Sequence, residues 1–306
     1  GGDEIHPILW YRRAFTLPAD MVGKRVWLRF GAVDFKTTVW VNGRCAGSHV
    51  GGYTPFGFDI SQLLKEGEND LCLRVQDEPD LAQPRGKQYW QRGLMGCWYT
   101  PVSGIWQTVY LEATGPYAFE SVLVTPDIDQ CTARLDVQLS DTPPRPLTAR
   151  FVVKLNGELQ QTASFEMDKK RASLTLDMRV EGVDSPRLWS PKSPTLYELE
   201  AVLEDAGGAS DSLRTWFGMR SIEVRNGQVL LNHQPIYLRM VLDQGYWPDT
   251  LLTPPSDEAI RADVQWIRDF GFNGVRKHQK IEDPRFYHWC DRLGLLVWGE
   301  LPSSYE

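Results

Sequence analysis

The sequence predicts a multidomain protein: an all-β jelly-roll sandwich, then an immunoglobulin-like β-sandwich, then a partial (β/α)8 (TIM) barrel comprising its first three βα units. Two observations support this. Up to about residue 218, apolar and polar side chains alternate with the period of two that is typical of half-buried strands. From residue 219, apolar strands are separated by segments of helical periodicity, a pattern that favours a parallel sheet covered by helices.

The first predicted domain, the jelly-roll sandwich, covers residues 1–115. The segment RVWLRF, residues 25–30, places three apolar side chains on one face of a strand. Asn42-Gly43 lies between two such segments, and this dipeptide favours a type I′ turn because both residues tolerate positive φ. Several strands of this kind, punctuated by glycine, are typical of an antiparallel sandwich.

The second predicted domain, the immunoglobulin-like sandwich, covers residues 116–218 and follows Gly115-Pro116. Short alternating segments such as ESVLVTPD, ARLDVQLSD and LYELEAVLED are separated by turn residues. This spacing is typical of an immunoglobulin-like sandwich, and the absence of a Cys–Trp–Cys pattern indicates that an antibody-type domain is not implied.

The third predicted domain covers residues 219–306, with strands expected at 234–244, 272–278 and 295–300. Three βα units in 88 residues make up roughly a third of a TIM barrel, which needs about 250 residues. The domain is therefore predicted to be the truncated, N-terminal part of such a barrel.

Two helices are expected between these strands. Ser256 is the predicted N-cap of the first helix. For the second, Asp283 is the predicted N-cap, Pro284 occupies the first helical position, and Gly294 ends the helix.

Polar side chains follow the predicted barrel strands at their carboxyl ends, where the chemistry of TIM barrels is located. The candidate substrate-binding residues there are Asp243, Gln244, Arg276, His278, Gln279 and Glu300. Alternatives remain open: Arg276 and Glu300 could form an ion pair at the barrel rim, and His278 could be a satisfied core histidine. Lys277 and Lys280 are expected to be solvated or to point toward flanking helices.

Composition narrows the function classes. A net charge of −7 gives no electrostatic reason to bind nucleic acid or an anionic membrane, and no apolar run is long enough to span a bilayer. The five scattered cysteines argue against a disulfide framework and a zinc site, so no metal and no cofactor are expected. Twelve tryptophans suit the apolar faces of sugar rings, although most such residues fill sandwich cores.

The sequence constrains the cellular compartment of the protein less than its fold. The N-terminal GGDEIHP shows no signal peptide, which favours a cytoplasmic protein, with a periplasmic or secreted one open if a leader was removed.

Motifs along nearly the whole chain resemble glycoside hydrolase family 2, the group of β-galactosidases, β-glucuronidases and β-mannosidases. The similar stretches include WYRRAFTLP (10–18), VDFKTTVWVNGRCAGSHVGGYTPFGFDI (33–60), SGIWQTVYLE (103–112), RTWFGMRSIEV (214–224) and NGVRKHQKIEDPRFYHWCDRLGLLVWGE (273–300). The resemblance implies a carbohydrate substrate, a retaining β-glycosidase of β-galactosidase-like type, and an oligomer such as relatives often form.

The sequence also departs from that family. Asp243-Gln244-Gly245 stands where an Arg-His-Glu run is usual. Arg276 matches the arginine that orients the nucleophilic carboxylate, whereas Gln279 stands at the position of a sugar-contacting histidine, with His278 one place earlier. Trp98 lies where some galactosidases carry an acidic residue, so galactose specificity is in doubt and Trp98 becomes a candidate substrate contact.

The resemblance places the acid/base glutamate in an Asn-Glu pair after the fourth barrel strand and the nucleophile after the seventh. This chain contains no Asn-Glu pair, so both catalytic glutamates are expected beyond Glu306 and the 306 residues are expected to be inactive alone. The alternative is a non-catalytic carbohydrate-binding or scaffold protein, because jelly rolls are common lectin folds and a fold does not determine function.

Overall fold

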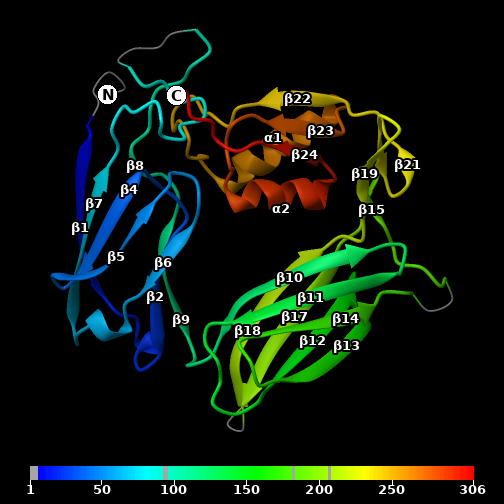
Figure 1. The fold of residues 1–306 in the computed structure, drawn as a ribbon, viewed down its shortest axis with the longest axis horizontal. Coiled ribbons are helices and arrows are strands. Elements are labelled where there is room, and N and C mark those ends of the chain that lie inside the picture. The colour runs from blue at the N-terminus through cyan, green and yellow to red at the C-terminus, as the bar shows by residue number, and fades with distance from the viewer. Residues whose placement is uncertain (1–5, 92–95, 181–182, 206–207) are drawn as a thin grey trace. The chain divides into compact units, whose positions relative to one another are not determined.

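The computed structural model describes residues 6–91, 96–180, 183–205 and 208–306. It separates into two compact units (Figure 1). Unit 1 combines Gly1–Ala113 with Met240–Trp289 and Val297–Glu306, and unit 2 combines Thr114–Arg239 with Cys290–Leu296.

The N-terminal part of unit 1 is a sandwich of two antiparallel sheets, with strand orders β1-β7-β4-β5 and β6-β2-β9, and a short β3-β8 ladder. Its elements are β1 (Ile8–Thr16), η1 (Ala19–Met21), β2 (Arg25–Phe30), β3 (Val33–Asp34), β4 (Lys36–Val41), β5 (Arg44–Val50), β6 (Phe56–Asp59), η2 (Ser61–Leu63), β7 (Glu68–Gln76), β8 (Gly104–Ile105) and β9 (Val109–Thr114).

The alternation read from the sequence places the core of this sandwich. Its buried side chains are Val26, Leu28, Phe30, Val33, Val39, Val41, Ile60, Leu71, Leu73 and Val75. Between β4 and β5, Asn42 and Gly43 have φ of 50° and 77°, which confirms the predicted turn with two positive φ angles.

Unit 2 is centred on a second sandwich, with strand orders β10-β11-β14 and β13-β12-β17-β18. Its strands are β10 (Phe119–Asp127), β11 (Thr132–Leu139), β12 (Leu147–Leu155), β13 (Glu158–Met167), β14 (Arg171–Asp177), β17 (Tyr197–Asp205) and β18 (Gly208–Phe217). Small ladders are formed by β15 (Trp189–Ser190), β16 (Ser193–Pro194), β19 (Ile222–Arg225), β20 (Gln228–Leu231) and β21 (Gln234–Pro235). The core contains Leu135, Phe151, Met167, Tyr197 and Leu203, each no more than 1% exposed.

The C-terminal part of the chain has the predicted alternation of strands and helices. The elements are β22 (Met240–Asp243), α1 (Asp257–Asp269), β23 (Gly274–Lys277), α2 (Pro284–Leu293) and β24 (Leu296–Gly299), with the strands in the order β22-β23-β24. β22 and β23 are parallel, which agrees with the partial TIM barrel. The prediction of one strand over 234–244 is wrong: residues 236–239 separate β21, which pairs antiparallel with β20, from β22.

Both predicted helix starts are present. The Ser256 side chain accepts a hydrogen bond from the Ala259 N–H at 3.1 Å and caps α1. At α2, a carboxylate oxygen of Asp283 accepts the Arg285 N–H at 3.0 Å, and Gly294, with φ of 77°, follows the last helical residue.

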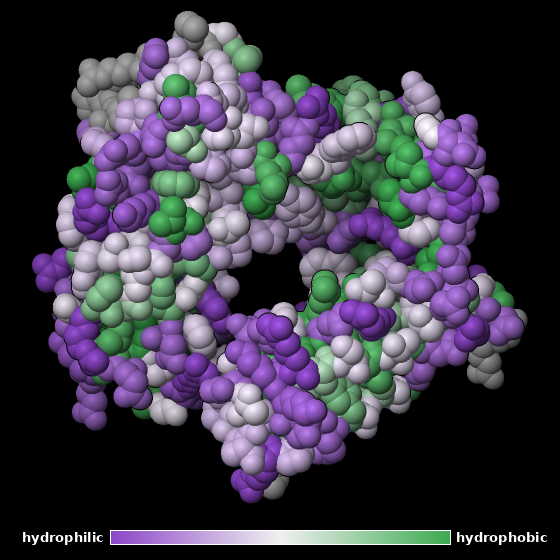
Figure 2. All heavy atoms as spheres, in the orientation of Figure 1, coloured by the Kyte–Doolittle hydropathy of each residue, from purple (hydrophilic) through white to green (hydrophobic). Residues whose placement is uncertain are grey.

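The two faces of the short parallel sheet differ. Lys277 lies over the Phe286 ring of α2, so this face of β23 is covered. Leu242 and Arg276 are register partners on the other face, and both are exposed. Figure 2 shows hydrophobic surface (green) over this part of the molecule, at the upper right.

Candidate functional site

Three of the predicted binding residues gather at the carboxyl ends of β23 and β24. The Arg276 Nε donates to one oxygen of Glu300, and the His278 Nδ1 lies 2.5 Å from the other. The side chains are 50%, 18% and 21% exposed for Arg276, His278 and Glu300. We call these residues the rim trio; the rim ion pair that the sequence left as an alternative is present, and His278 is part of it.

The charge state of the rim trio is set by Glu300. Burial acts to raise the pKa of its carboxyl, but the hydrogen bonds from Arg276 and His278 outweigh burial and lower that pKa below its ordinary value. Glu300 is therefore an ionised carboxylate that orients a guanidinium and an imidazole, and half of the guanidinium side chain is open to a ligand.

Asp243 lies on the opposite face of the sheet from Arg276. Its main-chain oxygen accepts the His278 N–H at 2.8 Å, but its carboxylate contacts the Lys277 Nζ at 2.5 Å. Lys277 also contacts Glu282 at 3.0 Å. The structure therefore brings the Asp243 backbone to the rim and places its carboxylate beneath it.

Lys277 and Lys280 are 1% and 2% exposed, so neither is solvated. Lys277 points toward the flanking helix α2, as one of the two predicted alternatives has it, whereas for Lys280 the prediction is wrong. Strand alternation turns Lys277 away from Arg276, and the ammonium is stabilised there by Asp243 and Glu282. Burial acts to lower the pKa of Lys277, but these two carboxylates raise it above its ordinary value.

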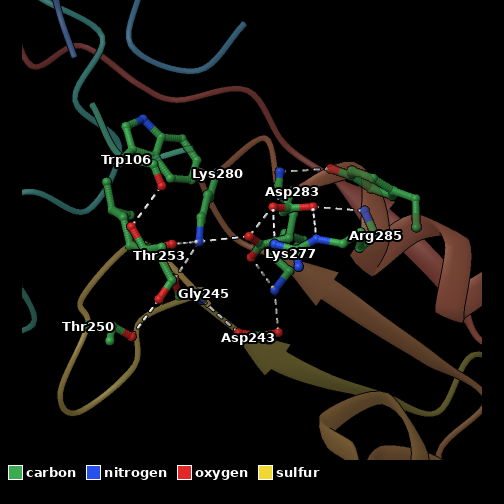
Figure 3. Close-up of polar contacts among 12 residues, drawn as sticks. Trp106, Asp243, Gly245, Thr250, Thr253, Lys277, Lys280, Asp283 and Arg285 are labelled. Carbon is green, nitrogen blue, oxygen red and sulfur yellow. Dashed lines mark hydrogen bonds and ion pairs between the residues drawn. The ribbon is translucent and has the colours of Figure 1, made fainter. Parts of the chain in front are cut away.

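The Lys280 ammonium is hydrogen-bonded to the loop that follows β22 (Figure 3). Its Nζ donates to the carbonyl oxygens of Gly245 and Leu252 at 2.7 and 2.9 Å and contacts Glu282 at 2.8 Å. Burial lowers the pKa of Lys280, and Glu282 opposes that shift. Glu282 thus joins both buried lysines, and we call Asp243, Lys277, Lys280 and Glu282 the buried network.

Two features fix the position of this loop. Gly245 has φ of 68°, and a Cβ there would lie 2.5 Å from the Lys280 Cδ. The loop also reaches the jelly roll of unit 1, because the Thr253 Oγ1 donates to the Trp106 main-chain oxygen at 2.8 Å and Lys280 lies 5.2 Å from the centroid of the Trp106 ring. The buried network therefore lies beneath the rim, and three of its members, Asp243, Lys277 and Glu282, also line a cavity on this side of the sheet.

The remaining predicted residues lie around the rim. Gln279 has φ of 59°, and its side-chain oxygen accepts the Tyr305 hydroxyl at 2.5 Å. Trp98 packs edge-on against Tyr305, with ring centroids 4.6 Å apart. Gln244 lines a cavity of about 460 Å³ together with Asp243. Trp98 and Gln279 are thus linked through Tyr305. Among the described residues, Gln244 belongs to the cavity lining, which does not include the rim trio.

Sequence reasoning missed the supporting residues Glu282, Trp106 and Tyr305. A usable signal existed for Lys277, since period-two alternation in a strand predicts that it faces away from Arg276. No comparable signal existed for Trp106 or Tyr305, which reach the site from distant parts of the chain.

Within the described ranges, no group of three or more His, Cys, Asp or Glu side chains could hold a metal ion. No helix in the described part of the chain is long and apolar enough to cross a membrane.

Three family models match consecutive parts of the chain. The model described as "Glycosyl hydrolases family 2, sugar binding domain" matches residues 3–114, "Glycosyl hydrolases family 2" matches 118–220, and "Glycosyl hydrolases family 2, TIM barrel domain" matches 222–304. The chain belongs to glycoside hydrolase family 2.

Relatives of this family 2 chain are glycosidases by name. A Formosa agariphila protein assigned as a β-glucuronidase is 28% identical over 96% of this chain and 35% of its own length. A β-galactosidase of Pseudoalteromonas haloplanktis is 25% identical over 96% of this chain and 28% of its own length. The crystal structure of a β-glycosidase from Bacteroides vulgatus matches 97% of this chain and 36% of its own with a TM-score of 0.80 and 25% identity.

The family 2 chain therefore spans about a third of the length of the curated relatives it matches. The matches confirm the family resemblance and the predicted fold classes. The substrate-binding roles of the predicted residues stay predictions.

Proposed function

We propose that the whole protein is a retaining exo-β-glycosidase that removes terminal β-linked sugars, and that the rim trio binds the sugar at the mouth of its barrel. The observation that carries the proposal is the rim trio itself. A half-exposed Arg276 is held by Glu300 beside His278, at the carboxyl ends of the parallel strands where TIM-barrel sites lie. Family membership and the glycosidase names of the relatives support it.

Glu300 is a positioning residue in this proposal and not the general acid. Both of its oxygens are engaged, and its pKa is lowered, whereas a general acid needs a raised pKa to keep its proton at neutral pH. A retaining mechanism needs two carboxyl groups about 5–5.5 Å apart, one as acid/base and one as nucleophile. We expect both beyond Glu306, so the 306 residues contribute binding and orientation.

The test measures the whole protein on p-nitrophenyl β-glucuronide, β-galactoside and β-mannoside. We expect turnover of one of them, with the β-anomer of the sugar formed first, as proton NMR would show. Arg276→Ala is expected to lower kcat/KM by about 100-fold, equivalent to about 2.7 kcal/mol of transition-state stabilisation. Glu300→Gln should cause a smaller loss, because it loosens Arg276 without removing it.

Arg225→Ala is the matched control, since Arg225 pairs with Glu223 at an exposed site of unit 2. Equal rates for Arg276→Ala and the wild type would contradict the role of the rim trio. A whole protein that binds these sugars but hydrolyses none would favour the non-catalytic carbohydrate-binding alternative. Turnover by the 306-residue chain alone would contradict the placement of both catalytic carboxylates beyond Glu306.

A further inference from the structure

The outward face of the sheet β1-β7-β4-β5 carries two tryptophans. Alternation buries Val39 and Leu73 in the sandwich core, so the alternate positions of the same strands face outward. Trp10 on β1 and Trp40 on β4 lie on that outward face, on either side of β7. Their ring centroids are 5.8 Å apart and their planes differ by 25°, an offset stack.

Trp10 is 61% exposed although it is held in place. Leaving a large apolar ring in water sacrifices burial that a folded protein would otherwise gain. Stacking on Trp40 restricts the Trp10 rotamers before any ligand arrives, which lowers the entropy that binding would lose. The pair is therefore a preorganised aromatic surface with Trp10 as its open part and Trp40 as its support.

Hydrogen-bonding groups surround the two rings on the same sheet. Arg74 is the register partner of both Trp10 and Thr38. The Arg74 Nη2 donates to Gln76 at 3.2 Å, and Gln76 donates to Glu78 at 2.5 Å. The guanidinium of Arg74 thus lies on the strand beside Trp10 and is linked by hydrogen bonds to an amide and a carboxylate further along the chain.

The charges on this face compensate one another. Arg12 pairs with Asp70 at 2.8 Å, and Arg74 and Glu78 are linked through Gln76. Lys36 and Glu68 also lie on this face, so it carries as many positive as negative side chains among those named. A neutral partner with many hydroxyl groups therefore fits this face better than an anion or a cation. An exposed aromatic ring flanked by neutralised polar groups matches the apolar face and polar edge of a neutral sugar.

We propose that Trp10, supported by Trp40, binds a neutral β-linked oligosaccharide on the outward face of the sheet β1-β7-β4-β5. A pyranose ring stacks on the Trp10 indole, and Arg74, Gln76 and Glu78 contact its hydroxyl groups. None of these residues belongs to the rim trio; the β-linkage rests on the proposed function, whereas the stacking of a sugar on Trp10 does not.

The test uses the 306-residue chain and three soluble probes: cellohexaose, mannohexaose and β-1,4-galactohexaose. Isothermal titration should detect binding of at least one of them. Trp10→Ala should weaken that binding about tenfold or more, and Trp40→Ala by less, because the open ring is kept but its support is lost. Trp10→Tyr keeps a flat ring and should stay within about threefold of the wild type.

Trp266→Ala is the matched control, because Trp266 on α1 is 62% exposed, close to the value for Trp10. Circular dichroism and thermal melting test whether each variant is folded. If Trp10→Ala does not fold, Trp10→Tyr serves as the second variant. The proposal is overturned if none of the three probes binds at about 10 mM, a concentration about tenfold above a weak Kd of about 1 mM. It is equally overturned if Trp10→Ala binds like the wild type or if Trp266→Ala weakens binding as much.

A further outcome would also overturn it. Light scattering that shows a dimer of the wild-type chain and a monomer of Trp10→Ala would mean that a second copy of the chain covers this face.

Discussion

The carboxyl group of Asp34 offers a sharp test of how burial controls the stability of unit 1. Asp34 is 1% exposed; one carboxylate oxygen accepts from the Gln88 side chain at 2.7 Å, and the other, among the described residues, has no hydrogen-bond partner. Burial, and then the nearby Asp77, raise the pKa of Asp34 from 3.8 to about 7, whereas Gln88 and Arg85 act to lower it.

The perturbation is Asp34→Asn, which removes the ionisable carboxyl group and keeps the size and shape of the side chain. Below pH 3.8 both the folded and the unfolded wild-type chain hold the proton, so the ionisation of Asp34 does not lower the free energy of unfolding. Between pH 3.8 and about 7 the unfolded chain releases the proton while the folded chain keeps it, so wild-type stability falls. Above pH 7 the full cost is present.

The magnitude follows from the two pKa values. A difference of about three pH units, at about 1.4 kcal/mol per unit, corresponds to about 4 kcal/mol of lost wild-type stability at pH 8. The variant lacks this loss, so its stability relative to the wild type should rise by about 3 kcal/mol between pH 4.5 and pH 8, whatever constant offset the amide itself introduces.

The assay is urea unfolding followed by tryptophan fluorescence at half-unit steps from pH 4.5 to pH 8.5. Trp106 contributes to this signal close to Asp34, because its indole N–H donates to the Gly52 carbonyl, next to Asp34. Asp249→Asn, at an exposed position, is the control for losing a carboxylate, and the pH-dependent gain of Asp34→Asn must exceed any change that this control shows. A difference for Asp34→Asn that is flat with pH would refute the reasoning, since Asp34 would then titrate alike in both states.

Three further substitutions test the contacts around the rim. Lys280→Met should lower the free energy of unfolding by about 3 kcal/mol, because Glu282 and two carbonyl groups lose a buried ammonium; urea titration measures it. Gly86→Ala should cost about 1–3 kcal/mol in the same assay, because φ is 60° and the new Cβ would lie 2.2 Å from the Gln279 carbonyl oxygen. Ser256→Ala should cost about 1 kcal/mol through the lost cap of α1, measured as a lower melting temperature.

Each of these has a matched control. Lys24→Met removes an exposed lysine from the same unit and should be neutral, so an equal loss would contradict the buried network. Gly67→Ala has a similar φ of 74° but no atom within 4 Å, so it isolates the backbone cost, and Gly86→Ala must exceed it. Ser256→Asp keeps a capping oxygen and should restore the melting temperature; a failure to do so would argue against the cap.

Much of the local structure could be predicted from the sequence, because it depends on neighbours a few residues apart. Alternation in residues 25–30 determined which side chains of β2 face the core, and Asn42-Gly43 determined the turn between β4 and β5. Ser256 and Asp283 determined where the two helices begin. The positions of Arg276, His278 and Glu300 at strand ends were sufficient to predict that they gather.

Only the tertiary structure decided which polar side chains are exposed and which are buried and hold neighbouring groups in place. Lys280 lies in the same short polar run as Arg276, but its three partners are Gly245, Leu252 and Glu282, and no local period places those atoms together. Tyr305 reaches Gln279, and the jelly roll brings Trp106 beside Lys280, across long stretches of chain. A charged side chain is buried only where folding supplies a compensating partner, and the position of that partner is a property of the whole fold.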